Sequence, residues 1–209
     1  GVNVALIGLH SLRRAIAVVP QDPFLFAGTL GNNLDPTRCH TREALAAALK
    51  MAGLNADLSC EVGNGGEKFS AGERQLVSIA RATLSKGRIV LMDEPTASCD
   101  GQTDARLQAV VQEAFPGRTI LCIAHRLNTI LGYDRILVME AGSIAELGTP
   151  EELLADPSSC FAGMVGKASL GHMEWSPAPL KWSRQAIATM ERNGTLPSVS
   201  STPSRGVAT

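Results

Sequence analysis

The spacing of the hydrophobic residues changes twice between residues 69 and 100, and each change predicts a different element. Apolar side chains first recur at helical spacing, at Leu76, Ile79, Ala80 and Leu84. Ser70 stands three residues before Glu73, which is the pattern of a capping box, and Lys86-Gly87 ends the run as a helix end should. Residues 89–92 are then continuously apolar, which predicts a short strand covered on both faces of a parallel sheet.

Two adjacent carboxylates, Asp93 and Glu94, follow this predicted strand. Ligands of open α/β sheets bind at the carboxyl ends of the strands, so the pair marks a candidate site. Each feature alone has a simpler interpretation, because Ser70 and Glu73 can merely cap a helix and an Asp-Glu pair is often a polar turn. Their order along one stretch, with Asp100 following, favours a functional site.

Similar patterns predict elements on both sides of this stretch. Upstream we expect a strand end and a helical turn in residues 1–14, a strand in 15–19 and a helix between Thr41 and Gly53. Downstream we expect a helix over 103–115, a buried strand over 119–124, a hairpin around Ala141-Gly142 and a helix capped by Thr149. In the helix over 103–115 the inward residues are Leu107, Val110 and Val111, and the outward ones are Asp104, Arg106 and Glu113. Phe161, Met164 and Val165 are expected to close the globular part.

Composition limits the classes of protein that fit. The 209 residues suffice for one domain, and the formal net charge of −1 with 4% aromatic residues argues against a nucleic-acid partner. The five cysteines are scattered, which favours reduced thiols in the cytosol. No apolar run reaches the roughly 20 residues of a membrane span. Residues 167–209 are rich in Pro, Ser and Thr, which predicts a mostly disordered tail; membrane or partner binding through Trp175 and Trp182 is the minor alternative.

The conjunction of motifs resembles the ATP-binding-cassette (ABC) ATPase domain. Residues 69–73, Phe-Ser-Ala-Gly-Glu, stand where this family usually has the signature Leu-Ser-Gly-Gly-Gln, and the strand before Asp93 resembles its Walker B strand. Gln21, after a strand and Pro20, resembles the Gln of its Q-loop. Residues 28–36 resemble the segment after the Q-loop in the second ATPase domain of the multidrug-resistance-associated exporters.

The resemblance covers roughly residues 1–166 and implies a fold. That fold is α/β, a mostly parallel sheet of the P-loop NTPase kind flanked by helices, with a helical subdomain inserted over residues 28–86. Phe24, Leu25 and Phe26 would then be partly exposed, on the surface that receives the coupling helices of the transmembrane domains.

The resemblance also implies a role for each motif residue. Asp93 would hold Mg²⁺ through water, Glu94 would be the general base, and Gln21 would meet the metal and the attacking water. His125, at the end of the next strand, would contact the γ-phosphate of ATP. A second ATPase domain would pair head to tail, and its ATP would face the signature residues and the D-loop aspartate, namely Ser70, Ala71, Gly72, Glu73 and Asp100.

A glycine-rich phosphate loop, GxxxxGK[ST], does not occur in the 209 residues. Gly166-Lys167 only imitates its end, because Ala168 stands where Ser or Thr is needed. In the family this loop precedes the Q-loop strand, so we expect a carboxyl-terminal fragment that lacks the first strands and the phosphate loop. The leading hypothesis is ATP hydrolysis that drives export at the cytosolic face of a membrane. The alternatives are a truncated domain that acts only as a dimerisation partner, and a soluble ABC ATPase of DNA repair or translation.

Overall fold

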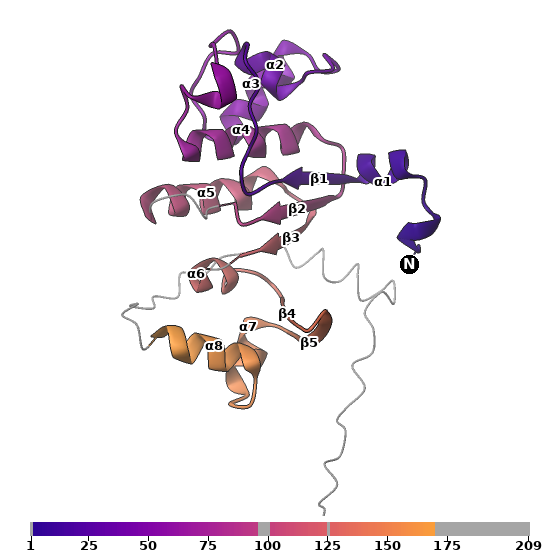
Figure 1. Cartoon of the computed structure of the whole chain (residues 1–209), viewed down its shortest axis with the longest axis vertical. Helices are drawn as coiled ribbons and strands as arrows, with labels where there is room; N and C mark the ends of the chain where they lie inside the picture. Colours follow the sequence, from indigo (N-terminus) through magenta and orange to yellow (C-terminus); the bar gives the residue numbers. More distant parts are fainter. Residues whose placement is uncertain (1, 96–100, 125, 170–209) are drawn as a thin grey trace, which may run out of the picture.

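The computed structural model describes residues 2–95, 101–124 and 126–169. A three-stranded sheet lies at the centre, helices lie above it, and a two-stranded hairpin with further helices lies below it in the view of Figure 1. This arrangement confirms the α/β fold that the sequence predicted.

The central sheet is parallel, with the strand order β1 (Ile16–Val19), β2 (Ile89–Asp93) and β3 (Thr119–Ile123). Val18 pairs with Leu91 and Leu91 pairs with Leu121, so these three side chains share one face of the sheet. Because all three strands run in the same direction, their carboxyl ends meet at one edge.

Three helices form the upper part of the molecule: α2 (Leu30–Leu34), α3 (Arg42–Met51) and α4 (Ala71–Leu84). Each begins with a side-chain cap, because Thr29, Thr41 and Ser70 each accept a hydrogen bond from the backbone N–H three residues later. The chain between α3 and α4 is a loop with one 3₁₀ turn, Asn64–Gly66. The predicted starts of α3 and α4 are therefore confirmed.

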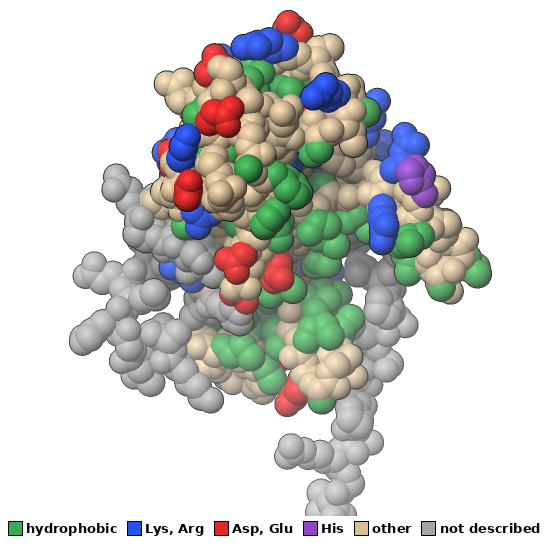
Figure 2. All heavy atoms as spheres, turned by 45° about the horizontal axis from the view of Figure 1, so that its top comes forward, with side chains coloured by type: hydrophobic (Ala, Val, Ile, Leu, Met, Phe, Trp, Pro, Cys, Tyr) green, Lys and Arg blue, Asp and Glu red, His purple; other side chains and the backbone are tan. Residues whose placement is uncertain are grey.

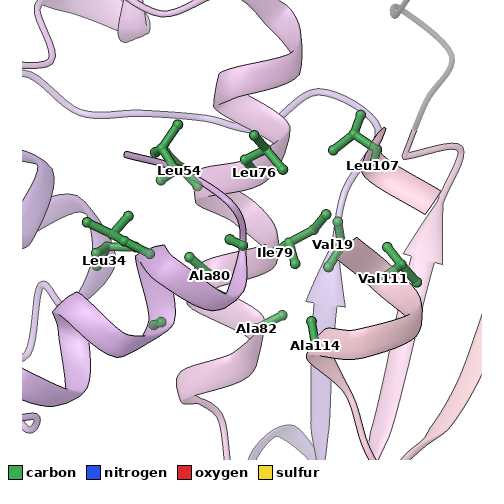
Figure 3. Packing of buried hydrophobic residues seen from close by; sticks show 14 of the residues in the cluster. Val19, Leu34, Leu54, Leu76, Ile79, Ala80, Ala82, Leu107, Val111 and Ala114 are labelled. Atoms are coloured by element: carbon green, nitrogen blue, oxygen red, sulfur yellow. The ribbon is translucent and has the colours of Figure 1, made fainter. Parts of the chain in front are cut away.

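Helices cover one face of the central sheet. α4 and α5 (Gly101–Ala114) pack on it, and Figure 3 shows Ile79, Val19 and Val111 converging between the helices and the strands. On the other face Leu121 is 57% exposed. The expectations that β2 is covered on both faces and that β3 is buried are wrong for this chain, since none of the described elements packs on the second face. β3 also lies at the edge of the described sheet, which leaves its residues half-buried or exposed.

One residue of α5 departs from the predicted pattern. Leu107 and Val111 are buried as expected, but Asp104, which we expected on the outward face, is buried as well. Its carboxylate lies 3.1 Å from Nη1 of Arg126 and accepts a hydrogen bond from Gln108 Nε2 at 3.0 Å. Burial of a carboxylate is tolerated when it is paired and hydrogen-bonded, and the pairing with Arg126 is invisible in the spacing along one helix.

The lower part follows β3. It contains α6 (Leu127–Ile130), the antiparallel hairpin β4 (Ile136–Glu140) and β5 (Ser143–Gly148), α7 (Pro150–Ala155) and α8 (Cys160–Ser169). The turn residues Ala141 and Gly142 have φ of +48° and +79°, as short hairpin turns of type I′ require. The hairpin and the Thr149 capping box of α7 are confirmed.

Both ends of the described chain differ from expectation. A 3₁₀ turn (Val4–Leu6) stands where a strand end was predicted, and the predicted helical turn is present as the longer helix α1 (Leu9–Ala15). Met164 is exposed, whereas Phe161 is buried as expected. α8 continues to Ser169, and the rest of the predicted tail, residues 170–209, lies outside the described residues. None of the helices in the described part of the chain has the length and apolar character needed to cross a membrane.

Candidate functional site

Gln21 and Glu94 meet at the carboxyl edge of the central sheet. Gln21 follows β1 after Pro20, and Glu94 directly follows β2. Because β1 and β2 are adjacent parallel strands, both residues lie at the same edge although they are 73 positions apart in the chain. Nε2 of Gln21 donates a hydrogen bond to Oε2 of Glu94 at 3.3 Å. The structure therefore brings together two of the predicted site residues.

Glu94 has an uncommon backbone conformation. Its φ is +43°, in the left-handed region that non-glycine residues seldom adopt. Its N–H donates to the carbonyl of Ile123 at 2.9 Å, which continues the pairing of β2 with β3 by one more residue. Such conformations cost on the order of 1–3 kcal/mol and gather at functional sites. The strand thus fixes the backbone of Glu94 while Gln21 holds its carboxylate.

Asp93 is the last residue of β2 and is exposed at the same edge. Among the described residues, no three His, Cys, Asp or Glu side chains gather closely enough to hold a metal ion by themselves. Mg²⁺ is commonly bound by one or two protein oxygens, with phosphates and water as the other ligands. Asp93 fits such a partial site. The side-chain oxygen of Gln21 fits too, because the nitrogen of that amide is engaged with Glu94.

Ser70 and Glu73 form the predicted capping box at the start of α4. Ser70 Oγ accepts a hydrogen bond from the N–H of Glu73 at 3.2 Å. In return, Oε2 of Glu73 accepts from both the N–H and the hydroxyl of Ser70 at 2.8 Å. Ser70 itself is exposed, so the capped end of α4 is open to a partner.

Gly72 has a packing role that the sequence did not reveal. It is buried, and a Cβ at this position would lie 2.5 Å from Cγ2 of Thr103 in α5. A side chain at position 72 would therefore push α4 and α5 apart. This contact accounts for a glycine here without any ligand, and the predicted approach of Gly72 to a phosphate stays a prediction.

A cleft of about 320 Å³ lies between the loop of residues 20–29 that follows β1, here called the Q-loop, and the first turn of α4. Gln21, Ala71, Gln75 and Pro95 are among the residues that line it. The first residue of α4 thus borders the same cleft as the Q-loop glutamine.

The Q-loop presents two aromatic rings to solvent. Phe24 and Phe26 are 63% and 55% exposed, and their rings pack edge to face with centroids 4.9 Å apart. Leu25 is fully buried between them, which corrects the expectation that all three residues are partly exposed. Arg81 of α4 donates to the carbonyl of Phe24 at 2.7 Å, and Asn33 donates to the carbonyl of Phe26 at 2.9 Å. These two side chains fix the loop that carries the rings.

Two predicted site residues, His125 and Asp100, lie outside the described residues. Arg126, the residue after His125, forms an ion pair with Asp104 of α5. Gln108 of α5 also donates to a hydroxyl of α6 at 2.9 Å. Arg126 and α6, which follow β3, are therefore held against α5 by these polar contacts.

The sequence interpretation missed the side chains that support the Q-loop: Asn33, Gln75 and Arg81. Each is polar and sits within a helix beside apolar core residues, as Gln75 sits beside the buried Leu76. A polar residue on an apolar helix face needs a hydrogen-bond partner, and this pattern could have singled them out. The partners of Gln75 and Arg81 lie 48 to 57 residues away, beyond what spacing along the chain shows, whereas Asn33 bonds to Phe26 seven residues before it.

Comparison with known proteins gives one consistent result. The family model described as ABC transporter matches residues 2–97. Multidrug resistance protein mrp-7 of Caenorhabditis elegans is 46% identical over 175 residues, which cover 80% of this chain and 12% of that protein. ATP-binding cassette sub-family C member 3 of Homo sapiens is 45% identical over 177 residues, which cover 81% of this chain and 12% of that protein.

A solved structure agrees with these relatives. The structure of a bacterial Atm1-family ABC exporter with ATP bound superposes with a TM-score of 0.70 and 35% sequence identity, over 79% of this chain and 30% of that one. The chain therefore belongs to the ABC transporter family, and its relatives include proteins of sub-family C, the multidrug-resistance type. It spans about 12% of the length of these relatives. The similarities do not favour a soluble ABC ATPase.

Proposed function

We propose that this chain forms part of an ABC ATPase domain, which binds ATP with Mg²⁺ and hydrolyses the ATP to drive export of a substrate across a membrane. One observation carries the proposal: Gln21 and Glu94 are hydrogen-bonded at the edge of a parallel sheet, next to the exposed Asp93. General-base attack by water requires a carboxylate held in a fixed position, and the neighbouring Asp93 can supply an oxygen to Mg²⁺. The similarity to an ABC exporter with ATP bound supports ATP as the nucleotide.

Each residue has a part in the proposed mechanism. Glu94 accepts the proton of the attacking water, and Gln21 holds the Glu94 carboxylate in place. Asp93 and the side-chain oxygen of Gln21 contribute ligands to Mg²⁺. When bound, Mg²⁺ neutralises charge on the phosphates. We keep His125 as the residue that stabilises charge on the γ-phosphate.

The proposed partners are a second ATPase domain and transmembrane domains. The amino end of α4, a 14-residue helix, carries the positive end of the helix dipole and an exposed Ser70, which suits an anion such as the phosphate of ATP on the second domain. Ala71, Gly72, Glu73 and Asp100 complete this proposed head-to-tail contact. The fixed and exposed rings of Phe24 and Phe26 are the proposed docking surface for the transmembrane domains. The proposed location of the chain is the cytosolic face of a membrane.

Steady-state ATP hydrolysis tests the proposal against the alternative of a passive dimerisation partner. In the full-length transporter, Asp93→Asn should raise the Mg²⁺ concentration for half-maximal hydrolysis at this domain's site. Asp57→Asn, at an exposed position in the loop before α4, is the control and should leave that concentration unchanged. If Asp93→Asn behaves like the control, the chain supplies no metal ligand and the passive role is favoured.

A further inference from the structure

Gln75 is a buried polar residue of α4 that the proposed mechanism does not use. It is 3% exposed, and its Nε2 donates to the carbonyls of Pro20 at 3.0 Å and Gln21 at 3.3 Å. Because both partners are acceptors, the amide nitrogen and not the oxygen must face them. Oε1 of Gln75 has no hydrogen-bond partner among the described residues. The buried location and the two donated bonds make this side chain a fixed anchor.

The two anchored carbonyls stand where the Q-loop begins. Pro20 follows β1 directly, and its ring restricts the backbone at that point. The carbonyl of Gln21 belongs to the same residue whose side chain donates to Glu94 at 3.3 Å. Gln75, Gln21 and Glu94 therefore form a continuous series of hydrogen bonds from α4 to the end of β2.

α4 holds the Q-loop at a second point, farther along the helix. Arg81 donates to the carbonyl of Phe24 at 2.7 Å, next to the exposed aromatic rings. The two anchors thus support different parts of one loop. Gln75 supports the part beside Glu94, and Arg81 supports the part that carries the proposed docking surface.

We propose that Gln75 is a positioning residue for ATP hydrolysis, which holds the backbone of Gln21 so that its side chain reaches Glu94. This inference rests on the proposed function and adds a link between two sites. α4 begins at the capped end that faces the ATP of the second domain, and Gln75 lies within its first two turns. A displacement of α4 when that ATP binds would reach the general base of this chain's own site through Gln75.

Side-chain amide NMR on the 209-residue chain tests the positioning directly. The Gln21 amide resonance is assigned by its loss in Gln21→Ala. In Gln75→Leu, which has no donor for the two carbonyls, this resonance should move toward the position that it has in Glu94→Ala. Arg118→Met is the matched control, because Arg118 donates to the carbonyls of Ala82 and Thr83 at the other end of α4. An unchanged Gln21 resonance in Gln75→Leu, with the fold intact, overturns the proposal.

Kinetics of the full-length transporter test the consequence. Gln75→Leu should lower kcat about tenfold with little change in KM for ATP, since the hydrogen bonds lost are of ordinary strength. Combined with Gln21→Ala it should cause no further loss, because both substitutions break the same series of contacts. Multiplicative losses, or an equal effect of Arg118→Met, would overturn the proposal. If Gln21→Ala itself leaves hydrolysis unchanged while the NMR shift is present, Gln75 still holds the loop, but Gln21 has no role in hydrolysis and the positioning proposal is overturned.

Discussion

Gly72 of α4 packs directly against Thr103 of α5, so closely that a Cβ on Gly72 would lie 2.5 Å from Cγ2 of Thr103. The helix that carries Ser70 and Gly72 therefore packs against the helix α5 through a contact between the backbone of Gly72 and the side chain of Thr103. This contact changes how substitutions at position 72 must be interpreted, because they act on the fold before they act on any ligand.

Gly72→Ala should destabilise the fold by about 1–3 kcal/mol, the usual cost of overpacking a tight interior contact. Denaturant unfolding of the 209-residue chain measures this. Gly163→Ala in α8 is the matched control, since a Cβ there meets no atom within 4 Å, and it should be neutral or stabilise by up to about 1 kcal/mol through helix propensity. Equal stability of the two variants would show that α4 and α5 do not depend on this contact.

Ser70 offers a cleaner test of the proposed contact with the second domain's ATP. Asp and Asn are both good caps, so Ser70→Asp and Ser70→Asn should each leave α4 formed. Both lose the hydroxyl that donates to Glu73, and only the first places a carboxylate at the exposed end, beside the carboxylate of Glu73. In the full-length transporter Ser70→Asp should reduce hydrolysis at the partner domain's site by like-charge repulsion, while ATP loading at this domain's own site survives. Photolabelling of each domain with an ATP analogue, beside a turnover assay, separates the two sites.

Ser70→Asn provides the comparison for that experiment. It should lower partner-site hydrolysis less than Ser70→Asp does. Loss of labelling at the domain's own site in Ser70→Asp, with an active partner site, would contradict the assignment of Ser70 to the partner's ATP.

Local elements were predictable because their signals lie within a few residues of each other. The capping boxes of Ser70 and Thr149 and the turn at Ala141-Gly142 are examples. The resemblance assigned Gln21 and Glu94 to one site, but the hydrogen bond between them, across 73 residues of chain, was not predicted. Burial was harder, because it depends on what covers a face: β3 is as apolar as a core strand and yet is half exposed.

Long-range polar contacts could not be predicted from the sequence. Asp104 lies at an outward position of the expected helix pattern but is buried against Arg126. Gln75 and Arg81 reach carbonyls 54 to 57 residues upstream. Such partners are set by the packing of α4 and α5 on the sheet, and no local pattern encodes them.

Asp35 makes the stability of the upper part of the molecule, which contains α2, α3 and α4, depend on pH. Its buried carboxylate accepts hydrogen bonds from Thr37 Oγ1 at 2.8 Å and from the N–H of His40 at 2.7 Å, and it lies 3.0 Å from Nδ1 of His40. Burial alone would raise the pKa of Asp35, but the hydrogen bonds and the charge of His40 outweigh it and lower the pKa to about 2. Because the folded pKa lies below the ordinary value of about 4, the ionised carboxylate stabilises the fold above about pH 4, and this stabilisation is lost as the pH falls toward 2.

Asp35→Asn should therefore unfold more readily than the wild type at neutral pH, and the difference should shrink between pH 4 and pH 2. Urea unfolding at a series of pH values measures it. Thr37→Val removes one of the donors and should produce a smaller difference of the same sign. A wild-type advantage that stays constant across this pH range would show that the carboxylate is not stabilised by its ionisation.

The most direct test of the proposed ATPase role is a comparison of ATP binding and turnover in Glu94→Gln. The amide keeps the shape of Glu94 and can still accept the hydrogen bond of Gln21, but it cannot take a proton from water. In the full-length transporter we expect ATP binding at this domain's site to remain and its hydrolysis to fall on the order of 10²–10⁴-fold. Glu113→Gln, at an exposed position of α5, is the matched control and should hydrolyse ATP at the wild-type rate. Wild-type hydrolysis by Glu94→Gln at this site would contradict the assignment of Glu94 as the general base.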